Sequence, residues 1–179
     1  VVRQLRADGW LVATAAPYPE RRGRPPMRLE IDPAAGLLVG ARVEPGVVRV
    51  LAATLDGQPV RNWQGPAGED PDAAVADLGR AVDALLGELG VDWTAVKAVG
   101  VGVPALVARG GHLAFGPNLG WRDVPMRERL AGLWPVPVVV DNDTKAAALA
   151  EKLFGTAQHA RDFVMIAGHS GIGGALYLG

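Results

Sequence analysis

Residues 137–151 read PVVVDNDTKAAALAE, a run of valines that passes directly into an alanine-rich helical pattern. The valines are typical of a buried strand, and a strand followed at once by a helix predicts an α/β fold. Asp141, Asn142 and Asp143 stand between the two patterns, at the carboxyl end of the strand. Ligands of open α/β sheets bind beyond this end of the strands. The stretch therefore predicts both the fold class and the place of a site.

Two interpretations of this polar cluster stay open. A helix that starts near Thr144 directs its free N–H groups back at Asp143 and orients that carboxylate. An oriented carboxylate accepts the proton of a sugar hydroxyl, and the amide of Asn142 both donates to and accepts from a second hydroxyl. The same position suits a plain helix N-cap equally well. Spacing alone does not decide between ligand and cap.

The rest of residues 36–179 gives further strand and helix signals. Turn signals at residues 44–46 and 56–57 separate three strand candidates, and the second is typical of a β-hairpin. Asp70 is the expected N-cap of a long amphipathic helix. The apolar run at 96–103 favours a central strand covered on both faces. The predicted mixed sheet has strands near 37–43, 47–55, 58–64, 96–103, 136–140 and 162–167, the first three antiparallel, with helices near 124–133 and 144–154.

Two glycine-containing segments are further candidates for a site. AFGPNLGW places Asn118 in a loop after a strand end, and HSGIGGALYLG supplies Gly171, Gly173 and Gly174. Glycines allow a backbone to approach a phosphate closely. Taken singly, each segment fits an ordinary turn as well.

Residues 1–31 have a different character. A short helical pattern is followed by two extended runs, 10–15 and 27–31, around a turn rich in proline and arginine. A helix followed by a two-stranded ribbon is the back half of a winged helix. Arginines at the tip of such a ribbon reach DNA phosphates or the minor groove, and a solvated basic loop is the alternative. The predicted DNA-binding residues are Arg3, Arg21, Arg22 and Arg24.

Composition excludes several classes of protein. The chain is 49% hydrophobic and 21% charged, which is ordinary for a globular protein, and no apolar run approaches the ~20 residues of a membrane span. It has no cysteine, which excludes disulfides and thiolate zinc sites within the segment and fits a cytoplasmic location. Val1 begins inside a helical pattern and Gly179 follows a strand-like run, so we expect a piece of a longer protein.

Taken together, these features resemble the ROK family of sugar kinases and sugar-responsive repressors. The resemblance is carried by the basic wing with GRPP, VGVGVPALV, PNLGW, VDNDTKAAALAE and GIGGALYLG, in this order. It implies the actin-like (ribonuclease-H-like) ATPase fold. Residues 1–31 are then the C-terminal part of a winged-helix DNA-binding domain. Residues 36–179 are the first lobe of the sugar-binding domain, with the second lobe absent from this chain.

The resemblance also assigns roles to residues. Asn118, Asn142 and Asp143 match sugar ligands, and Asp143 would be the catalytic base in a kinase. The glycines of the last segment match a second phosphate loop, although Ala175 stands where a further glycine is usual. Lys145 stands where the family commonly has asparagine, so the sugar preference could differ. The matching loop glycines are Gly171, Gly173 and Gly174.

One departure separates the chain from the kinases. Kinases of the family carry an Asp-x-Gly-Gly-Thr phosphate loop in the first hairpin, whereas residues 42–46 here read RVEPG. Arg42 cannot replace a carboxylate, and Pro45 lacks an N–H donor. We therefore expect a non-enzymatic repressor that binds DNA and a sugar or sugar derivative.

The resemblance implies no cofactor or metal in this chain, with a structural zinc possible in the missing C-terminal part. It also implies a homodimer or homotetramer that does not bind membranes. The alternatives are an ATP-dependent hexose kinase, and a domain kept only for dimerisation in which the polar residues act as caps.

Overall fold

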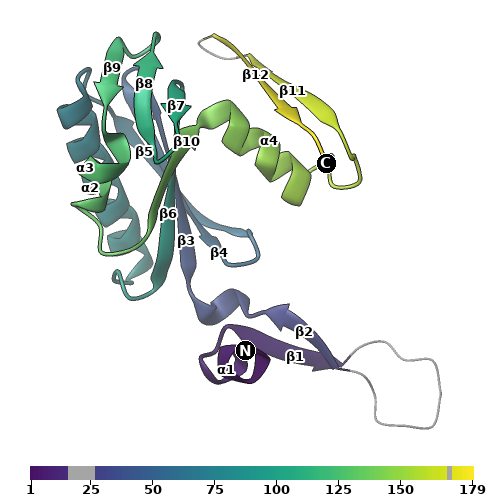
Figure 1. Ribbon diagram of the computed structural model, residues 1–179. Coiled ribbons are helices and arrows are strands. Elements are labelled where there is room, and N and C mark those ends of the chain that lie inside the picture. Colours follow the sequence, from purple (N-terminus) through teal and green to yellow (C-terminus); the bar gives the residue numbers. More distant parts are fainter. Residues whose placement is uncertain (16–26, 169–170) are drawn as a thin grey trace, which may run out of the picture.

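The computed structural model describes residues 1–15, 27–168 and 171–179. Figure 1 shows a small N-terminal unit, formed by α1, β1 and β2, joined to a larger lobe. Helix α1 (Val2–Ala7) is followed by strand β1 (Leu11–Ala15), which pairs with β2 (Met27–Ile31) in an antiparallel ribbon. The helix and both strands were predicted, and all three are confirmed. The residues between the two strands, which include the predicted Arg21, Arg22 and Arg24, lie outside the described residues.

A short 3-10 helix, η1 (Pro33–Ala35), leads from β2 into the lobe. Asp32 caps it by accepting a hydrogen bond from the Ala34 N–H at 2.9 Å. The backbone N–H of Asp32 also donates to the carbonyl of Trp10 at 2.9 Å. The link between the two parts is therefore short and hydrogen-bonded.

The lobe is built on a mixed sheet, as predicted, but this sheet has five strands and not the six that were expected. Strands β3 (Leu37–Glu44), β4 (Val47–Thr54) and β5 (Pro59–Pro66) form an antiparallel meander. Strand β6 (Val96–Val103) then pairs in parallel with β3, and β10 (Val138–Asn142) pairs in parallel with β6. The spatial order is β10-β6-β3-β4-β5. The carboxyl ends of β3, β6 and β10 consequently lie at one edge of the sheet.

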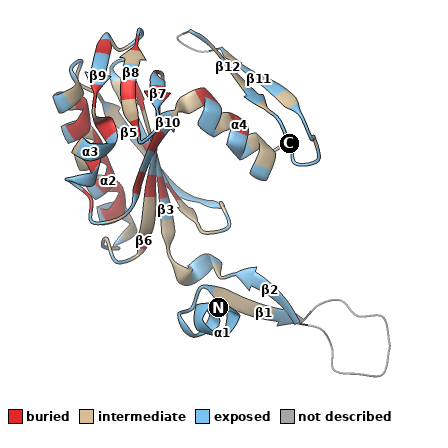
Figure 2. Ribbon diagram, viewed as in Figure 1, coloured by how far each residue is buried: buried red, intermediate tan, exposed pale blue. Residues whose placement is uncertain are grey.

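One face of the sheet carries the core. Helix α2 (Pro71–Leu89) lies on it, starting at the N-cap Asp70, whose carboxylate accepts the Ala73 N–H at 2.8 Å. Leu78 and Leu85 of α2 are fully buried, and the short helix α3 (Met126–Ala131) lies beside α2. Figure 2 shows the buried residues gathered between these helices and the sheet. Most of the apolar stabilisation of the lobe comes from this layer.

The opposite face is covered less, which corrects two expectations. Helix α4 (Asp143–Leu153) lies over this side, but Gly100 of β6 is exposed, so β6 is not covered on both faces. Strand β10 is an edge strand of the described sheet, and Val139 is 63% exposed while Val138 and Val140 are buried. A short apolar run does not distinguish one buried face from two. Because β10 pairs in parallel with β6, its carboxyl end still lies at the edge of the sheet where the site was predicted.

Two pieces of the lobe differ from the prediction. A separate three-stranded sheet contains β7 (Leu106–Ala108), β8 (His112–Gly116) and β9 (Trp121–Val124). A two-stranded hairpin, β11 (Phe163–Gly168) with β12 (Ile172–Tyr177), packs against α4. The predicted strand near 162–167 therefore belongs to this hairpin and not to the main sheet. Gly173 and Gly174 lie within strand β12, whereas a glycine loop was expected.

Candidate functional site

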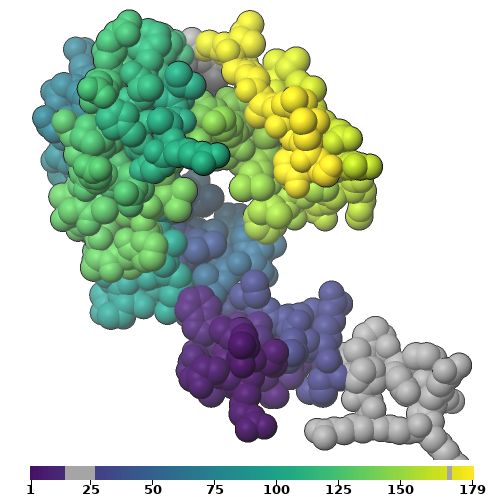
Figure 3. All heavy atoms as spheres, in the orientation of Figure 1, coloured from purple at the N-terminus to yellow at the C-terminus, as the bar shows by residue number. Residues whose placement is uncertain are grey.

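A cleft of about 550 Å³ opens at the carboxyl edge of the main sheet. Figure 3 shows the surface hollowed between the three-stranded sheet and the β11–β12 hairpin. The volume lies within the usual range for small-molecule sites. All six residues assigned to sugar and phosphate binding line this cleft: Asn118, Asn142, Asp143, Gly171, Gly173 and Gly174.

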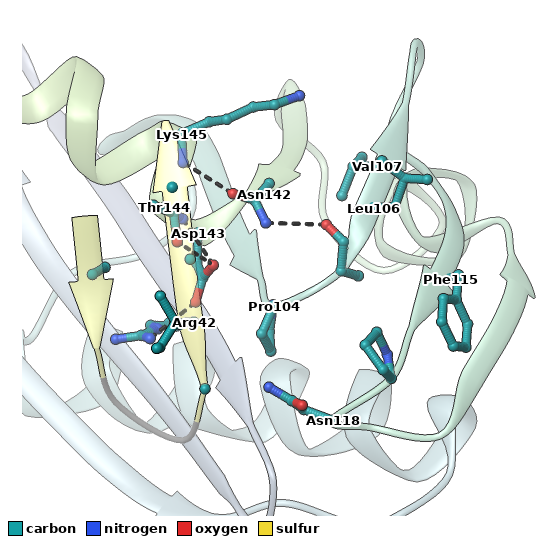
Figure 4. A pocket seen from close by; sticks show the side chains of 17 residues that line it. Arg42, Pro104, Leu106, Val107, Phe115, Asn118, Asn142, Asp143, Thr144 and Lys145 are labelled. Atoms are coloured by element: carbon teal, nitrogen blue, oxygen red, sulfur yellow. Dashed lines mark hydrogen bonds and ion pairs between the residues drawn. The ribbon is translucent and has the colours of Figure 1, made fainter. Parts of the chain in front are cut away.

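Asn142 is the N-cap of α4. Its Oδ1 accepts a hydrogen bond from the Lys145 N–H at 3.0 Å, and its Nδ2 donates to the carbonyl of Ala105 at 3.1 Å (Figure 4). The amide thus joins the start of the helix to the segment that follows β6. The cap that the sequence analysis considered for Asp143 belongs to Asn142, one residue earlier. Capping therefore does not account for the carboxylate at position 143.

Asp143 is the first residue of α4, and its side chain is only 12% exposed. Its Oδ2 accepts a hydrogen bond from Arg42 Nη2 at 2.9 Å, and its Oδ1 accepts one from the Thr144 N–H at 2.8 Å. Each carboxylate oxygen has lone pairs for a further donor. A Cβ on Gly102 would stand 3.3 Å from the Cα of Asp143, so the glycine at this point of β6 allows the close approach.

Arg42 is the residue of the cleft whose role the sequence analysis did not foresee. Its guanidinium, on β3, also pairs with Glu44 at 3.0 Å, and Arg49 on β4 pairs with Glu44 as well. Arg42 and Arg49 face each other across the β3–β4 ladder, so the Glu44 carboxylate between them offsets a like-charge pair. With Asp143, the four charges sum to zero. The sequence could have indicated this arrangement, because two arginines that oppose each other in a predicted hairpin favour a carboxylate between them.

An apolar wall lies opposite the polar residues of the cleft. It is contributed by Pro104, Leu106, Val107, Phe115 and Pro117. The guanidinium of Arg122 stacks over the ring of Phe115, 4.0 Å from its centroid. These residues were missed because they belong to the short strands β7 and β8 and to the turns beside them.

The glycines of the β11–β12 hairpin allow it to approach the rest of the cleft. A Cβ on Gly171 would lie 3.1 Å from Asn118 Nδ2, and a Cβ on Gly173 would overlap the hydroxyl of Thr144 in α4. Close packing therefore favours glycine at both of these positions. Gly174 faces Met165 at an ordinary contact distance, 3.8 Å from a built Cβ to the carbonyl oxygen.

Of the four arginines predicted to contact DNA, Arg3 is described, and it lies exposed on α1. Within residues 1–15, 27–168 and 171–179, no three His, Asp or Glu side chains lie close enough together to hold a metal ion. The helices of the same residues are too short or too polar to cross a bilayer.

Comparison with known proteins gives matches of two kinds. The chain is 25% identical over 152 residues to the xylose repressor of Bacillus subtilis, covering 84% of this chain and 40% of that protein. A ROK family transcriptional regulator, a homologue of the E. coli MLC protein, superposes with a TM-score of 0.82 and 25% identity over 99% of this chain. A ROK family glucokinase from Streptomyces griseus, solved with glucose and AMPPNP, gives a TM-score of 0.73 and 28% identity over 80% of this chain.

The chain spans less than half the length of these proteins, with 45% of each of the two solved chains covered. The family model of the ROK family matches residues 53–179, which is more than half of the chain. The actin-like fold expected from the sequence is that of the ROK kinases and regulators that the lobe resembles. The chain belongs to the ROK family.

Proposed function

We propose that this chain is part of a sugar-responsive transcriptional repressor, comprising the end of its DNA-binding head and the first lobe of its sugar-binding domain. The observation that carries the proposal is the ion pair between Arg42 and Asp143, 2.9 Å apart. In a kinase of the family, the residue matching Asp143 deprotonates the sugar hydroxyl. Here a fixed guanidinium occupies one of its oxygens.

The hairpin that carries Arg42 supports the same reading. Strands β3 and β4 stay paired up to Glu44 and Val47, and the chain reverses at Pro45 and Gly46. Such a tight turn with a proline offers no row of free N–H groups for a phosphate. Phosphoryl transfer depends on such positioning of the nucleotide phosphates. We infer that the lobe binds its ligand without transferring phosphate.

The balance of charge favours an uncharged ligand. The charges of Arg42 and Arg49 are matched by Glu44 and Asp143. Lys145, a further cation among the described residues that line the cleft, has its Nζ 3.7 Å from a carboxylate oxygen of Asp141. Among the described residues that line the cleft, each cation thus lies beside a carboxylate, which does not favour a phosphorylated or acidic sugar, whereas hydroxyl groups suit carboxylate and amide side chains. The apolar wall suits the C–H face of a sugar ring.

The N-terminal unit provides the second line of support. The regulator structure matches 99% of this chain, whereas the glucokinase structure matches 80%. A helix followed by a β-ribbon with a basic tip is the expected end of a winged helix. Repressors of this kind couple a DNA-binding head to a ligand-binding body, and the proposal assigns the two described parts to these roles.

The direct experiment compares sugar binding with phosphate transfer in the full-length protein. Calorimetry with D-glucose, D-xylose and D-glucose 6-phosphate measures binding, and a coupled assay with ATP and the same two free sugars measures ADP release. We expect a free sugar to bind, its phosphate ester to bind more weakly, and no sugar-dependent ADP to form. Turnover of ATP would establish the hexose kinase instead. Failure of both sugars to bind, together with sugar-independent DNA binding, would favour a domain kept for assembly.

The basic tip gives a separate prediction. Replacing Arg21, Arg22 and Arg24 by alanine should weaken DNA binding, because each guanidinium in contact with a phosphate releases a counterion. The slope of log affinity against log salt concentration should become shallower by about 0.9 for each lost contact. Fluorescence anisotropy on a DNA fragment from upstream of the protein's own gene measures it. An unchanged slope would identify the tip as a solvated loop.

A further inference from the structure

We propose that helix α4 transmits the occupancy of the sugar cleft to the N-terminal unit, through Phe154 and the turn between β4 and β5. The inference rests on the proposed function and names the path by which that function would be regulated. The path has three physical links: a helix that starts in the cleft, a ring that contacts a stiff turn, and an apolar pocket that joins this turn to the N-terminal unit.

The first link is the helix. Asn142 and Asp143 place the start of α4 in the cleft, and the helix ends at Leu153 after 11 residues. At 1.5 Å for each residue it spans about 16 Å. A hydrogen-bonded helix of this length moves as one body. A ligand that pulls on Asp143 therefore displaces the far end as well.

The second link lies directly after the helix. The ring of Phe154 packs on Gly57 of the β4–β5 turn, where a built Cβ would stand 2.9 Å from Cε1 and 3.0 Å from Cζ. Gly57 has a φ of +86°, which favours glycine at this point. Two backbone hydrogen bonds hold the turn, Gly57 N–H to Thr54 O and Thr54 N–H to Gln58 O, both at 2.9 Å, and the Gln58 N–H also donates to the side-chain Oγ1 of Thr54 at 3.0 Å. Force on Gly57 moves the turn as a unit.

The third link is Leu55 of the same turn. Leu55 lines an apolar pocket of about 290 Å³ whose other walls belong to the N-terminal unit: Leu5, Trp10, Leu11 and Ile31. An interface with this much open apolar space is loosely packed compared with a protein core. The ammonium of Lys97 on β6 lies 5.4 Å from the centroid of the Trp10 ring, so a cation–π contact also joins β6 to the N-terminal unit. The orientation of the N-terminal unit is thus sensitive to the position of Leu55.

The contact at Phe154 is suited to signalling because it contributes little to the fold. Phe154 is 60% exposed, so truncating its ring removes little buried area from the core. Leu153, the last residue of α4, is 56% exposed and provides a matched control next to Phe154. A substitution at either site should leave the lobe folded, which allows the coupling to be measured separately from stability.

The test uses full-length protein with Phe154→Ala, Leu153→Ala and Leu55→Ala. The probe is whichever of D-xylose and D-glucose binds the parent in calorimetry. Hydrogen exchange of the backbone amides in β1 and β2 is measured with and without the sugar, and so is affinity for the upstream DNA fragment. Allosteric coupling typically changes affinity by about 5- to 150-fold.

We expect Phe154→Ala and Leu55→Ala to bind the sugar as the parent does, while the sugar-induced changes in DNA affinity and in β1–β2 exchange fall toward none. Leu153→Ala should keep both responses. Equal responses in the parent and in Phe154→Ala would overturn the relay and leave the proposed function intact. A parent whose DNA binding ignores both sugars would overturn the proposed function, and the relay with it.

Discussion

Asp143→Asn is expected to lower the affinity for the sugar by roughly one to two orders of magnitude. A hydrogen bond from a sugar hydroxyl to a charged carboxylate is worth about 1.5–3 kcal/mol, and the amide removes that charge while keeping the size. The unfolding free energy without sugar should fall by about 1–3 kcal/mol, because the substitution weakens the hydrogen bond with Arg42, while Asn142 still caps the helix and Arg42 keeps Glu44 as a partner. Calorimetry and urea unfolding give the two quantities.

The neighbouring substitution Asn142→Asp provides a comparison in which the stability of the ligand-free protein is also expected to fall. Aspartate still caps a helix, but it loses the donor that bonds the carbonyl of Ala105 and sets a carboxylate against that oxygen. The ligand-free protein should therefore lose about 1–3 kcal/mol of stability. If Asp143→Asn instead costs several kcal/mol while sugar affinity survives, the carboxylate is a structural element and the proposed site is wrong.

The elements that the sequence predicted well are those with a strong local signal. The helix after Asp70 has a cap and a regular apolar stripe, and the hairpin at residues 56–57 has its turn residues in place. The three-stranded sheet was missed because β7 has only three residues and glycines interrupt its turns. So short a strand shows no measurable alternation. Its place is set by contacts within the lobe.

The candidate site also has parts that the sequence predicted and parts that it did not. Asn142 and Asp143 were predicted because they stand at a strand end, where a parallel sheet gathers its ligands, and Asn118 was assigned by the family resemblance; all three line the cleft. The ion pair of Arg42 with Asp143 joins residues that are 101 positions apart, and the sequence around either residue does not predict it. The sequence analysis treated Arg42 as the loss of a carboxylate. The structure adds that this arginine is the counter-ion of Asp143.

Arg42→Asp, which restores the charge that the kinases carry near this point, is expected to lower the unfolding free energy by roughly 3–5 kcal/mol. That is the usual cost of leaving a buried charge without its partner, here Asp143, whereas Glu44 keeps Arg49. The side chains of Glu44 and Asp143 are 7% and 12% exposed, so water compensates them poorly. The substitution removes the cation that both share and adds a third carboxylate. Because Arg42 itself is 42% exposed, we expect the lower end of the range. Urea unfolding of the full-length protein measures it.

Two further variants separate charge from packing at this position. Arg42→Met keeps an apolar stem and adds no charge, so it should cost less, about 1–3 kcal/mol, and it remains measurable if Arg42→Asp fails to fold. Adding Asp143→Asn to Arg42→Asp removes one repulsion and should recover part of the loss, with a coupling of about 0.5–3 kcal/mol. If Arg42→Asp is as stable as the parent, the cluster tolerates either charge at position 42. Pro45 alone would then oppose phosphate binding by the hairpin, and the hexose kinase would have to be tested again as the alternative.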